Sequence, residues 1–91
     1  MVKVDSIIFQ TNEFDVVDID KEKVIMNLEK GKYFSLNIMG SRILEMIYNK
    51  TRVEEIIESL TKEYDVEEII CEKCVLEYLN DLEKINLIKV I

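Results

Sequence analysis

The sequence predicts an α+β fold in which strands come first and helices follow. Before Asn37, apolar and polar residues alternate, which is typical of strands. After Asn37, apolar residues recur at intervals of three and four, which is typical of helices with one buried face. A chain of 91 residues has the size of one domain. We therefore expect a single domain, residues 1–91, with a three-stranded antiparallel sheet followed by three helices.

The first two strands of this sheet are expected in the segments Val16–Ile19 and Lys23–Glu29. The first alternates imperfectly between valine or isoleucine and aspartate. In the second, a period of two places Val24, Met26 and Leu28 on one face.

A turn at Gly31 leads to the third strand, Lys32–Leu36, because glycine adopts positive φ without steric cost. The segment 1–12 is expected to be either an extra strand, at Ile7–Gln10, or an arm that is exchanged in a homodimer.

The first helix is expected to begin at Asn37, a residue type favoured as an N-cap. Its apolar stripe comprises Ile43, Leu44, Ile47 and Tyr48. Thr51 and Glu54 match the capping-box pattern, so a second helix is expected from there to about Tyr64. Its core stripe comprises Val53, Ile56, Ile57 and Leu60.

The third helix is expected over Val66–Ile85, with Asp65 as its cap and Glu68 at the third position. Its apolar positions are Ile70, Cys71, Cys74, Val75, Tyr78, Leu79, Leu82 and Ile85. Asn86 is expected as a left-handed cap, after which Leu87–Ile91 closes onto the core.

Composition argues against several classes of partner. The net charge is −7, and the 12 basic residues are scattered among 19 acidic ones, so neither nucleic acid nor a membrane is an expected partner. No apolar run approaches the roughly 20 residues of a membrane span, and the N-terminus lacks the pattern of a signal peptide. We therefore expect a cytoplasmic protein.

Nothing in the sequence supports catalysis. Histidine, the commonest general base, is absent. Cys71 and Cys74 offer two thiolates where a structural zinc site usually needs four ligands, and both fit the apolar stripe of a helix. We expect both cysteines to be core residues, with no metal site, no cofactor and no enzyme activity.

The strand Lys32–Leu36 is the candidate binding element, because an edge strand can template an added peptide strand. Phe34 is expected to face the core, whereas Tyr33 fits either the core or the binding surface. A hairpin beside three helices also resembles a winged helix, an architecture that often binds DNA. However, the outer face of the third helix is too acidic for that role. The residues of this outer face are Glu67, Glu72, Lys73, Glu77, Asn80, Asp81 and Lys84.

One block of sequence carries a family resemblance. The block Gly31–Gly40 reads G-K-Y-F-S-L-N-x-x-G, Tyr64-Asp65-Val66 follows at a fixed distance, and Leu87-Ile88 closes the chain. In this combination, from Phe14 to Ile91, the sequence resembles the PqqD family, the recognition element of ribosomally made, post-translationally modified peptides.

The resemblance implies a winged-helix-like fold and a non-catalytic adaptor that binds the leader of a precursor peptide. It implies that the leader adds a strand beside the third strand and lies against the third helix. Carried over, the peptide-binding residues are Lys32, Tyr33, Phe34, Ser35, Leu36, Cys71, Cys74, Val75, Tyr78 and Leu79. The implied recipient is a modifying enzyme, either a radical S-adenosylmethionine protein or a leader peptidase. The alternative is a small structural or regulatory interaction domain of winged-helix type that does not bind a leader.

Overall fold

The computed structural model describes residues 1–11, 14–20, 22–27, 30–47 and 49–91. The described residues form, in chain order, β1 (Ile7–Gln10), β2 (Asp15–Ile19), β3 (Glu22–Asn27), β4 (Lys32–Leu36), α1 (Ile38–Met46), β5 (Thr51–Arg52), α2 (Val53–Tyr64), α3 (Glu68–Lys84) and β6 (Ile88–Val90). The predicted α+β class is confirmed, with a three-stranded antiparallel sheet followed by helices.

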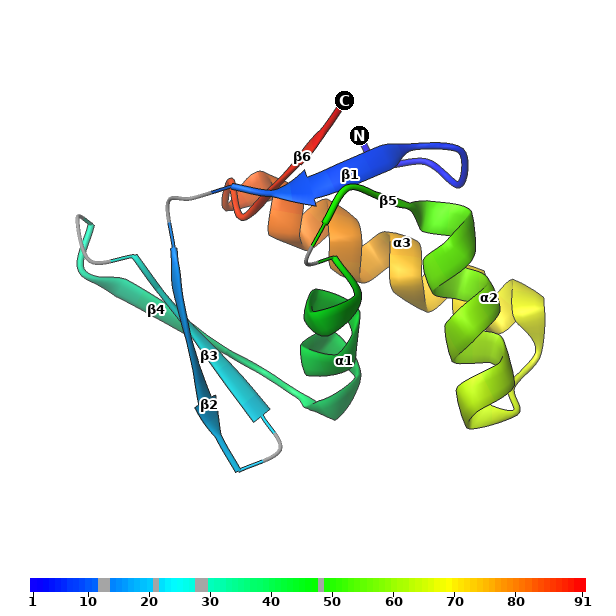
Figure 1. Cartoon of the computed structure of the whole chain (residues 1–91), viewed down its shortest axis with the longest axis horizontal. Coiled ribbons are helices and arrows are strands. Elements are labelled where there is room, and N and C mark those ends of the chain that lie inside the picture. Colours follow the sequence, from blue (N-terminus) through cyan, green and yellow to red (C-terminus); the bar gives the residue numbers. More distant parts are fainter. Residues whose placement is uncertain (12–13, 21, 28–29, 48) are drawn as a thin grey trace.

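The strands form two separate sheets (Figure 1). The first has the order β2-β3-β4 and is antiparallel throughout. The second has the order β5-β1-β6, so β1 lies between a strand from the middle of the chain and one from its C-terminal end. The strand expected at Ile7–Gln10 is confirmed as β1, and the segment that was expected to close onto the core does so as β6.

The turn between β3 and β4 follows the local sequence. Gly31 has φ 65°, the left-handed conformation that glycine adopts without steric cost. The side-chain oxygen of Asn27 accepts a hydrogen bond from the backbone amide of Lys30 at 3.0 Å. The register then pairs Asn27 with Lys32 as β4 begins.

Val24 and Met26 share one face of β3, as predicted, but that face is only half-buried. The core residue of β3 is Ile25, which points to the opposite face and has no exposed surface. Leu28, expected to continue the row of Val24 and Met26, lies outside the described residues.

α1 begins where the sequence predicts. The side chain of Asn37 accepts a hydrogen bond from the amide of Gly40 at 2.8 Å, which satisfies one of the free donors of the first turn. Ile43, Leu44 and Ile47 are buried. Tyr48, which was placed on the same stripe, lies outside the described residues.

The capping box predicted for α2 is wrong. Thr51 pairs with β1 as part of β5, and its hydroxyl donates to the carbonyls of Met46 and Asn49. The N-cap is Arg52, which makes no side-chain capping bond. The amide of Val53 donates to the carbonyl of Ser6 at 3.0 Å, so the N-terminal segment supplies an acceptor for the first amide of the helix.

The predicted cap of α3 is also wrong. Asp65 has φ 50° and ends α2 in the left-handed conformation, so α3 begins later, at Glu68. Along α3 the buried residues are Cys71, Val75, Leu79 and Leu82. Ile70, expected in the core, is 54% exposed, because the first turn of α3 leaves that side uncovered.

α3 ends in a Schellman motif, and Asn86 is its left-handed cap, as the sequence predicted. Asn86 has φ 64°, and its amide donates to the carbonyl of Glu83 at 3.0 Å. The amide of Leu87 donates to the carbonyl of Leu82 at 3.0 Å, and both of these leucines are buried. This cap directs the chain into β6.

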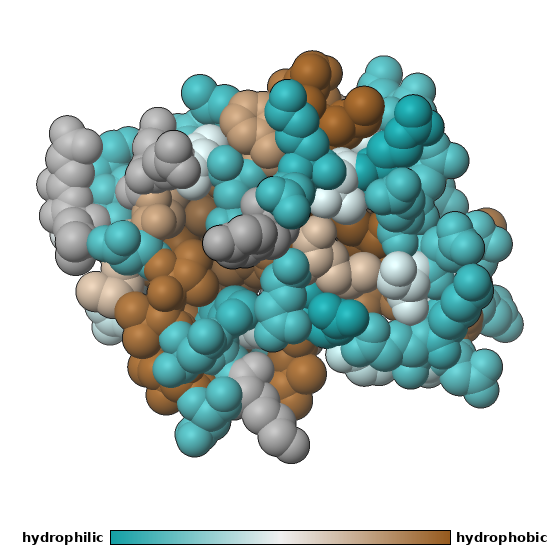
Figure 2. Space-filling model, viewed as in Figure 1, coloured by the Kyte–Doolittle hydropathy of each residue, from teal (hydrophilic) through white to brown (hydrophobic). Residues whose placement is uncertain are grey.

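The surface is unevenly polar. In Figure 2 apolar residues gather over the sheet β2-β3-β4, whereas the part of this face over α2 is mostly hydrophilic. Val16, Val17 and Ile19 of β2 are 40%, 44% and 56% exposed. Of the helices in the described part of the chain, none has the length and apolar character needed to cross a membrane.

Candidate functional site

β4 lies at the edge of its sheet. Its residues Lys32–Leu36 pair with β3 on one side, and within the described residues no strand pairs with the other side. The backbone amides and carbonyls along such an edge can pair with an added strand. The edge position predicted for this strand is therefore present in the structure.

The two aromatic residues of β4 point to opposite faces of the sheet. Phe34 is opposite Ile25, the core residue of β3, whereas Tyr33 is opposite Met26 on the outer face. Tyr33 is 73% exposed, and Phe34 is half-buried. The sequence did not indicate which face of the sheet Tyr33 occupies. In the structure, its side chain lies on the face that points away from the helices.

A groove of about 390 Å³ runs between β4 and the C-terminal half of α3. Most of its wall is apolar, with one acidic and one basic side chain among the lining residues. The lining residues are Ile25, Phe34, Ser35, Leu36, Tyr78, Asp81, Leu82, Lys84 and Ile85. An added strand on β4 would place alternate side chains over this groove.

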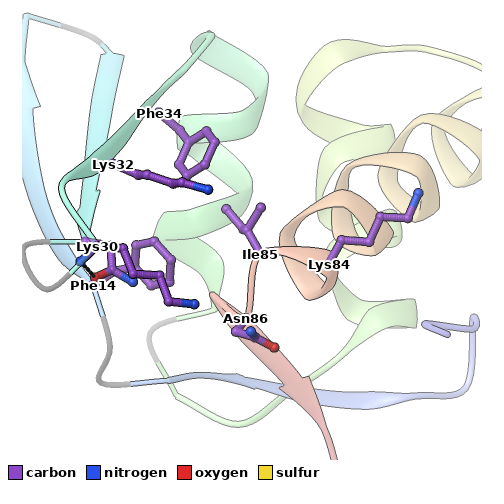
Figure 3. A pocket seen from close by; sticks show the side chains of 8 residues that line it. Phe14, Lys30, Lys32, Phe34, Lys84, Ile85 and Asn86 are labelled. Carbon is purple, nitrogen blue, oxygen red and sulfur yellow. Dashed lines mark hydrogen bonds between the residues drawn. The ribbon is translucent and has the colours of Figure 1, made fainter.

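The groove continues into a smaller opening of about 170 Å³ beside the start of β4 (Figure 3). Phe34, Lys84 and Ile85 line both spaces. The other residues that line the opening are Phe14, Asn27, Lys30, Lys32 and Asn86. This end of the groove is therefore rich in lysine.

A third hollow, of about 280 Å³, lies beyond the other end of the groove. It is lined by Met39 of α1 and, on α3, by Cys74, Glu77, Tyr78 and Asp81. Tyr78 and Asp81 also line the central groove, so the three spaces adjoin one another along α3.

Of the binding residues implied by the resemblance, the structure brings Phe34, Ser35, Leu36 and Tyr78 together around the central groove. Lys32 lies at the basic opening and Cys74 in the third hollow.

Three of the implied residues are buried in the core and do not line the groove. Cys71 is 3% exposed, and Val75 and Leu79 have no exposed surface, so these side chains support α3 from within the core. The Cys71 thiol lies 3.7 Å from the carbonyl of Ile57 as a donor to it. The expectation that both cysteines are core residues is confirmed for Cys71 and wrong for Cys74, which is exposed.

Sequence reasoning missed several residues that line the groove. Asp81 and Lys84 were placed on the solvent face of the third helix, and Leu82 and Ile85 were assigned only to its core stripe. A helical spacing of three, four and seven residues puts Asp81, Leu82 and Ile85 on the same side as Tyr78. That spacing was a signal in the sequence, but it became useful only once the position of β4 was known.

Among the residues that the structure describes, no group of three or more histidine, cysteine, aspartate or glutamate side chains is placed to hold a metal ion. Within the described ranges, one side chain has a perturbed pKa. The pKa of Arg42 is raised because its guanidinium donates to the carboxylate of Glu63 at 3.0 and 3.1 Å. This pair links α1 to α2, and neither residue lines the groove.

Comparisons with known proteins agree with this geometry. The sequence profile of PqqD, coenzyme PQQ synthesis protein D, matches residues 22–88. The solved structure of TbiB1 in complex with the TbiA(beta) leader peptide is 30% identical and has a TM-score of 0.82, with 89% of this chain and 94% of that chain covered. A lasso peptide synthetase B1 complexed with the leader peptide is 20% identical and has a TM-score of 0.75, with 90% and 96% covered. No curated protein sequence matches the chain.

Proposed function

Because the chain belongs to the PqqD family, we propose that it captures the leader of a precursor peptide and presents it to a modifying enzyme. In this proposal the leader adds as a strand to β4 and lays alternate side chains into the groove against α3. The observation that carries the proposal is the edge of β4, which no strand of the described residues pairs with, beside an apolar groove. The 30% identical TbiB1, whose structure contains a leader peptide, supports it.

The sheet has a second edge, β2, but β2 is a poorer docking site. All five of its residues are exposed. A hollow of about 380 Å³ lies beside Val16 and Asp18 of β2, but polar or charged side chains, those of Gln10, Lys23 and Glu45, form most of the rest of its lining. Asp15 and Asp18 lie within it, and charged residues on an edge discourage strand addition. β4 combines main-chain groups with side-chain pockets, and a bound peptide requires both for affinity and selectivity.

We propose that the bound leader is anchored by an apolar side chain seated among Phe34, Leu36 and Tyr78. Burying one such side chain stabilises a complex by roughly 1.5–3 kcal/mol before the cost of ordering the peptide. Each main-chain hydrogen bond to β4 adds a net of about 0.5–1.5 kcal/mol. Several weak contributions therefore add up along the strand.

We also propose that the chain acts without catalysis and passes the leader to a separate enzyme. The absence of histidine from the sequence supports this part of the proposal. The recipient is either a radical S-adenosylmethionine protein or a leader peptidase. Co-purification of each candidate with the tagged chain, with and without the leader, distinguishes the two.

A titration followed by NMR tests the proposal. Synthetic leaders, one for each short open reading frame that neighbours the gene of this protein, are added in turn to the isotope-labelled chain. We expect amide shifts along Lys32–Leu36 and on the groove side of α3, and a scrambled leader should produce none. Saturable binding that leaves the β4 amides unshifted would refute strand addition, and no binding of the leader would refute the proposed function.

A further inference from the structure

The groove has a basic end. Lys30 and Lys32 line the opening beside the start of β4, and Lys84 borders both the opening and the central groove. These are three of the twelve basic residues of a chain whose net charge is −7. No carboxylate of a described residue lines this opening. The local charge is therefore opposite to that of the whole molecule.

The floor of this opening is apolar. Figure 3 shows the side chains of Lys32 and Phe34 extending from the strand side toward Ile85, and that of Lys30 extending toward Asn86. The side chain of Lys84 extends along the end of α3, away from the other two lysines. Phe14 and Phe34 line the same space as these lysines. An anionic group here would meet ammonium groups beside low-dielectric walls, where charge attraction is stronger than in open water.

The other end of the groove has the opposite charge. Asp81 lines the central groove, and with Glu77 it also lines the hollow beyond Tyr78. An acidic side chain of a bound peptide would be repelled there and attracted to the lysine end. The two ends together therefore favour the peptide orientation that puts its acidic side chain at the lysine end, over the orientation that puts it at the acidic end.

Strand geometry fixes how far apart the acidic residue and the apolar anchor residue lie along a peptide that is paired with β4. Lys32, Phe34 and Leu36 point to one face of β4, because alternate residues of a strand share a face. In a peptide paired with β4, the residue beside Lys32 and the residue beside Phe34 are likewise two positions apart.

We infer that the groove selects a peptide that carries an aspartate or glutamate two residues from an apolar side chain, with the acid beside Lys30 and Lys32. The inference rests on the proposed function and specifies the chemistry of the peptide. The order of the acidic and apolar residues in the peptide reports whether it runs parallel or antiparallel to β4.

Selection from a displayed library of random 12-residue peptides tests the inference without knowledge of the natural leader. The wild-type chain should enrich peptides with an acidic residue at a fixed offset of two from an apolar residue. A Lys30→Glu, Lys32→Glu chain should instead enrich lysine or arginine at that offset. Lys62→Glu, Lys73→Glu, an equal charge change at exposed positions of α2 and α3 outside these hollows, is the matched control and should keep the wild-type preference.

One enriched peptide then allows a double-mutant cycle by calorimetry. Changing its acidic residue to the neutral amide should weaken binding to the wild-type chain about fivefold, the upper range for a solvent-exposed pair. The same change should have no effect on a Lys30→Gln, Lys32→Gln chain that circular dichroism shows to be folded.

The outcomes separate the two proposals. Peptides that bind at β4 without an acidic residue at the fixed offset, or a preference that survives charge reversal, would overturn the inference and leave the proposed function standing. Recovery of no peptide by the wild-type chain would overturn both.

Discussion

A β-carbon built on Gly40 would lie 2.7 Å from Cε1 of Tyr78 and 3.2 Å from its Cζ. Non-bonded carbon atoms prefer about 3.5–4.0 Å, so the Tyr78 ring lies where only a glycine leaves room for it. α1 and α3 thus come together at a glycine, and the ring they position forms one wall of the groove.

Gly40→Ala should disturb the groove while leaving the fold in place. Alanine favours the helix by about 1 kcal/mol, but its β-carbon must push the Tyr78 ring aside. We expect the affinity for a leader peptide to fall at least about fivefold, equivalent to roughly 1 kcal/mol, as measured by calorimetry. Adding Tyr78→Leu removes the clashing ring atoms, so in that background the alanine should cost no further affinity. If Gly40→Ala lowered the leader affinity equally in the Tyr78 chain and in the Tyr78→Leu chain, the contact with the Tyr78 ring would not be the cause.

Tyr78→Glu and Val75→Glu should fail in different ways. Tyr78 is half-buried at the groove, so a charge there should weaken peptide binding while the chain stays folded. Val75 has no exposed surface, and an unpaired buried carboxylate should unfold the chain or depress its thermal midpoint severely. Circular dichroism with thermal melting, followed by peptide titration, measures both effects. Unfolding of Tyr78→Glu would mean that this ring acts as a core residue.

Alanine substitutions of the neighbours Tyr33 and Phe34 compare the outer face of β4 with the face that lines the groove. Phe34→Ala removes a groove wall and should lower both peptide affinity and stability, the latter by about 1–3 kcal/mol because the ring is only partly buried. Tyr33→Ala changes the exposed outer face and should alter affinity by less than about twofold, within the small range of surface substitutions. Fluorescence anisotropy with a labelled leader measures the affinities. An equal loss of affinity in both variants would place the peptide elsewhere.

Asn86 can be tested for its part in ending α3. Asn86→Ala should lower the free energy of unfolding by about 1 kcal/mol. At φ 64° the β-carbon of alanine is crowded by the backbone, and alanine lacks the side-chain hydrogen bonds by which asparagine tolerates this conformation. Asn86→Gly should be neutral or stabilising, since glycine adopts this conformation freely. Urea denaturation of the three chains gives the values. A glycine variant as unstable as the alanine variant would show that the asparagine side chain matters for another reason.

The two cysteines should differ in reactivity. Cys74 is exposed and should react with iodoacetamide in the folded chain, whereas Cys71 is buried and should react only after unfolding. Mass spectrometry of peptic fragments before and after denaturant assigns each adduct. Equal labelling in the native chain would contradict the burial of Cys71.

Much of the fold could be predicted because its signals are local. A period of two, a turn glycine at Gly31 and a capping asparagine at Asn37 each act on residues no more than about four positions away. The same holds for the C-terminal cap at Asn86. The predictions that failed were local patterns overridden by distant partners. The capping box predicted at Thr51 does not form, because Thr51 pairs with β1. The carbonyl of Ser6 accepts the hydrogen bond of the first helical amide of α2.

The candidate site was only partly predictable for the same reason. The sequence indicated an edge strand and an apolar helix, which are properties of single elements. It did not indicate the side of Tyr33 or the turn of α3 that faces β4, because both depend on how the sheet packs against the helices. The structure moves the groove one to two turns toward the C-terminal end of α3, to Tyr78, Leu82 and Ile85.

By itself, the sequence determined the order of strands and helices, their turns and most of their ends, since these follow from interactions between residues close in the chain. Tertiary structure alone decided that both ends of the chain meet in the sheet β5-β1-β6. It also brought lysines to one end of the groove and carboxylates to the other. Such arrangements depend on contacts between residues far apart in sequence, which no local pattern specifies.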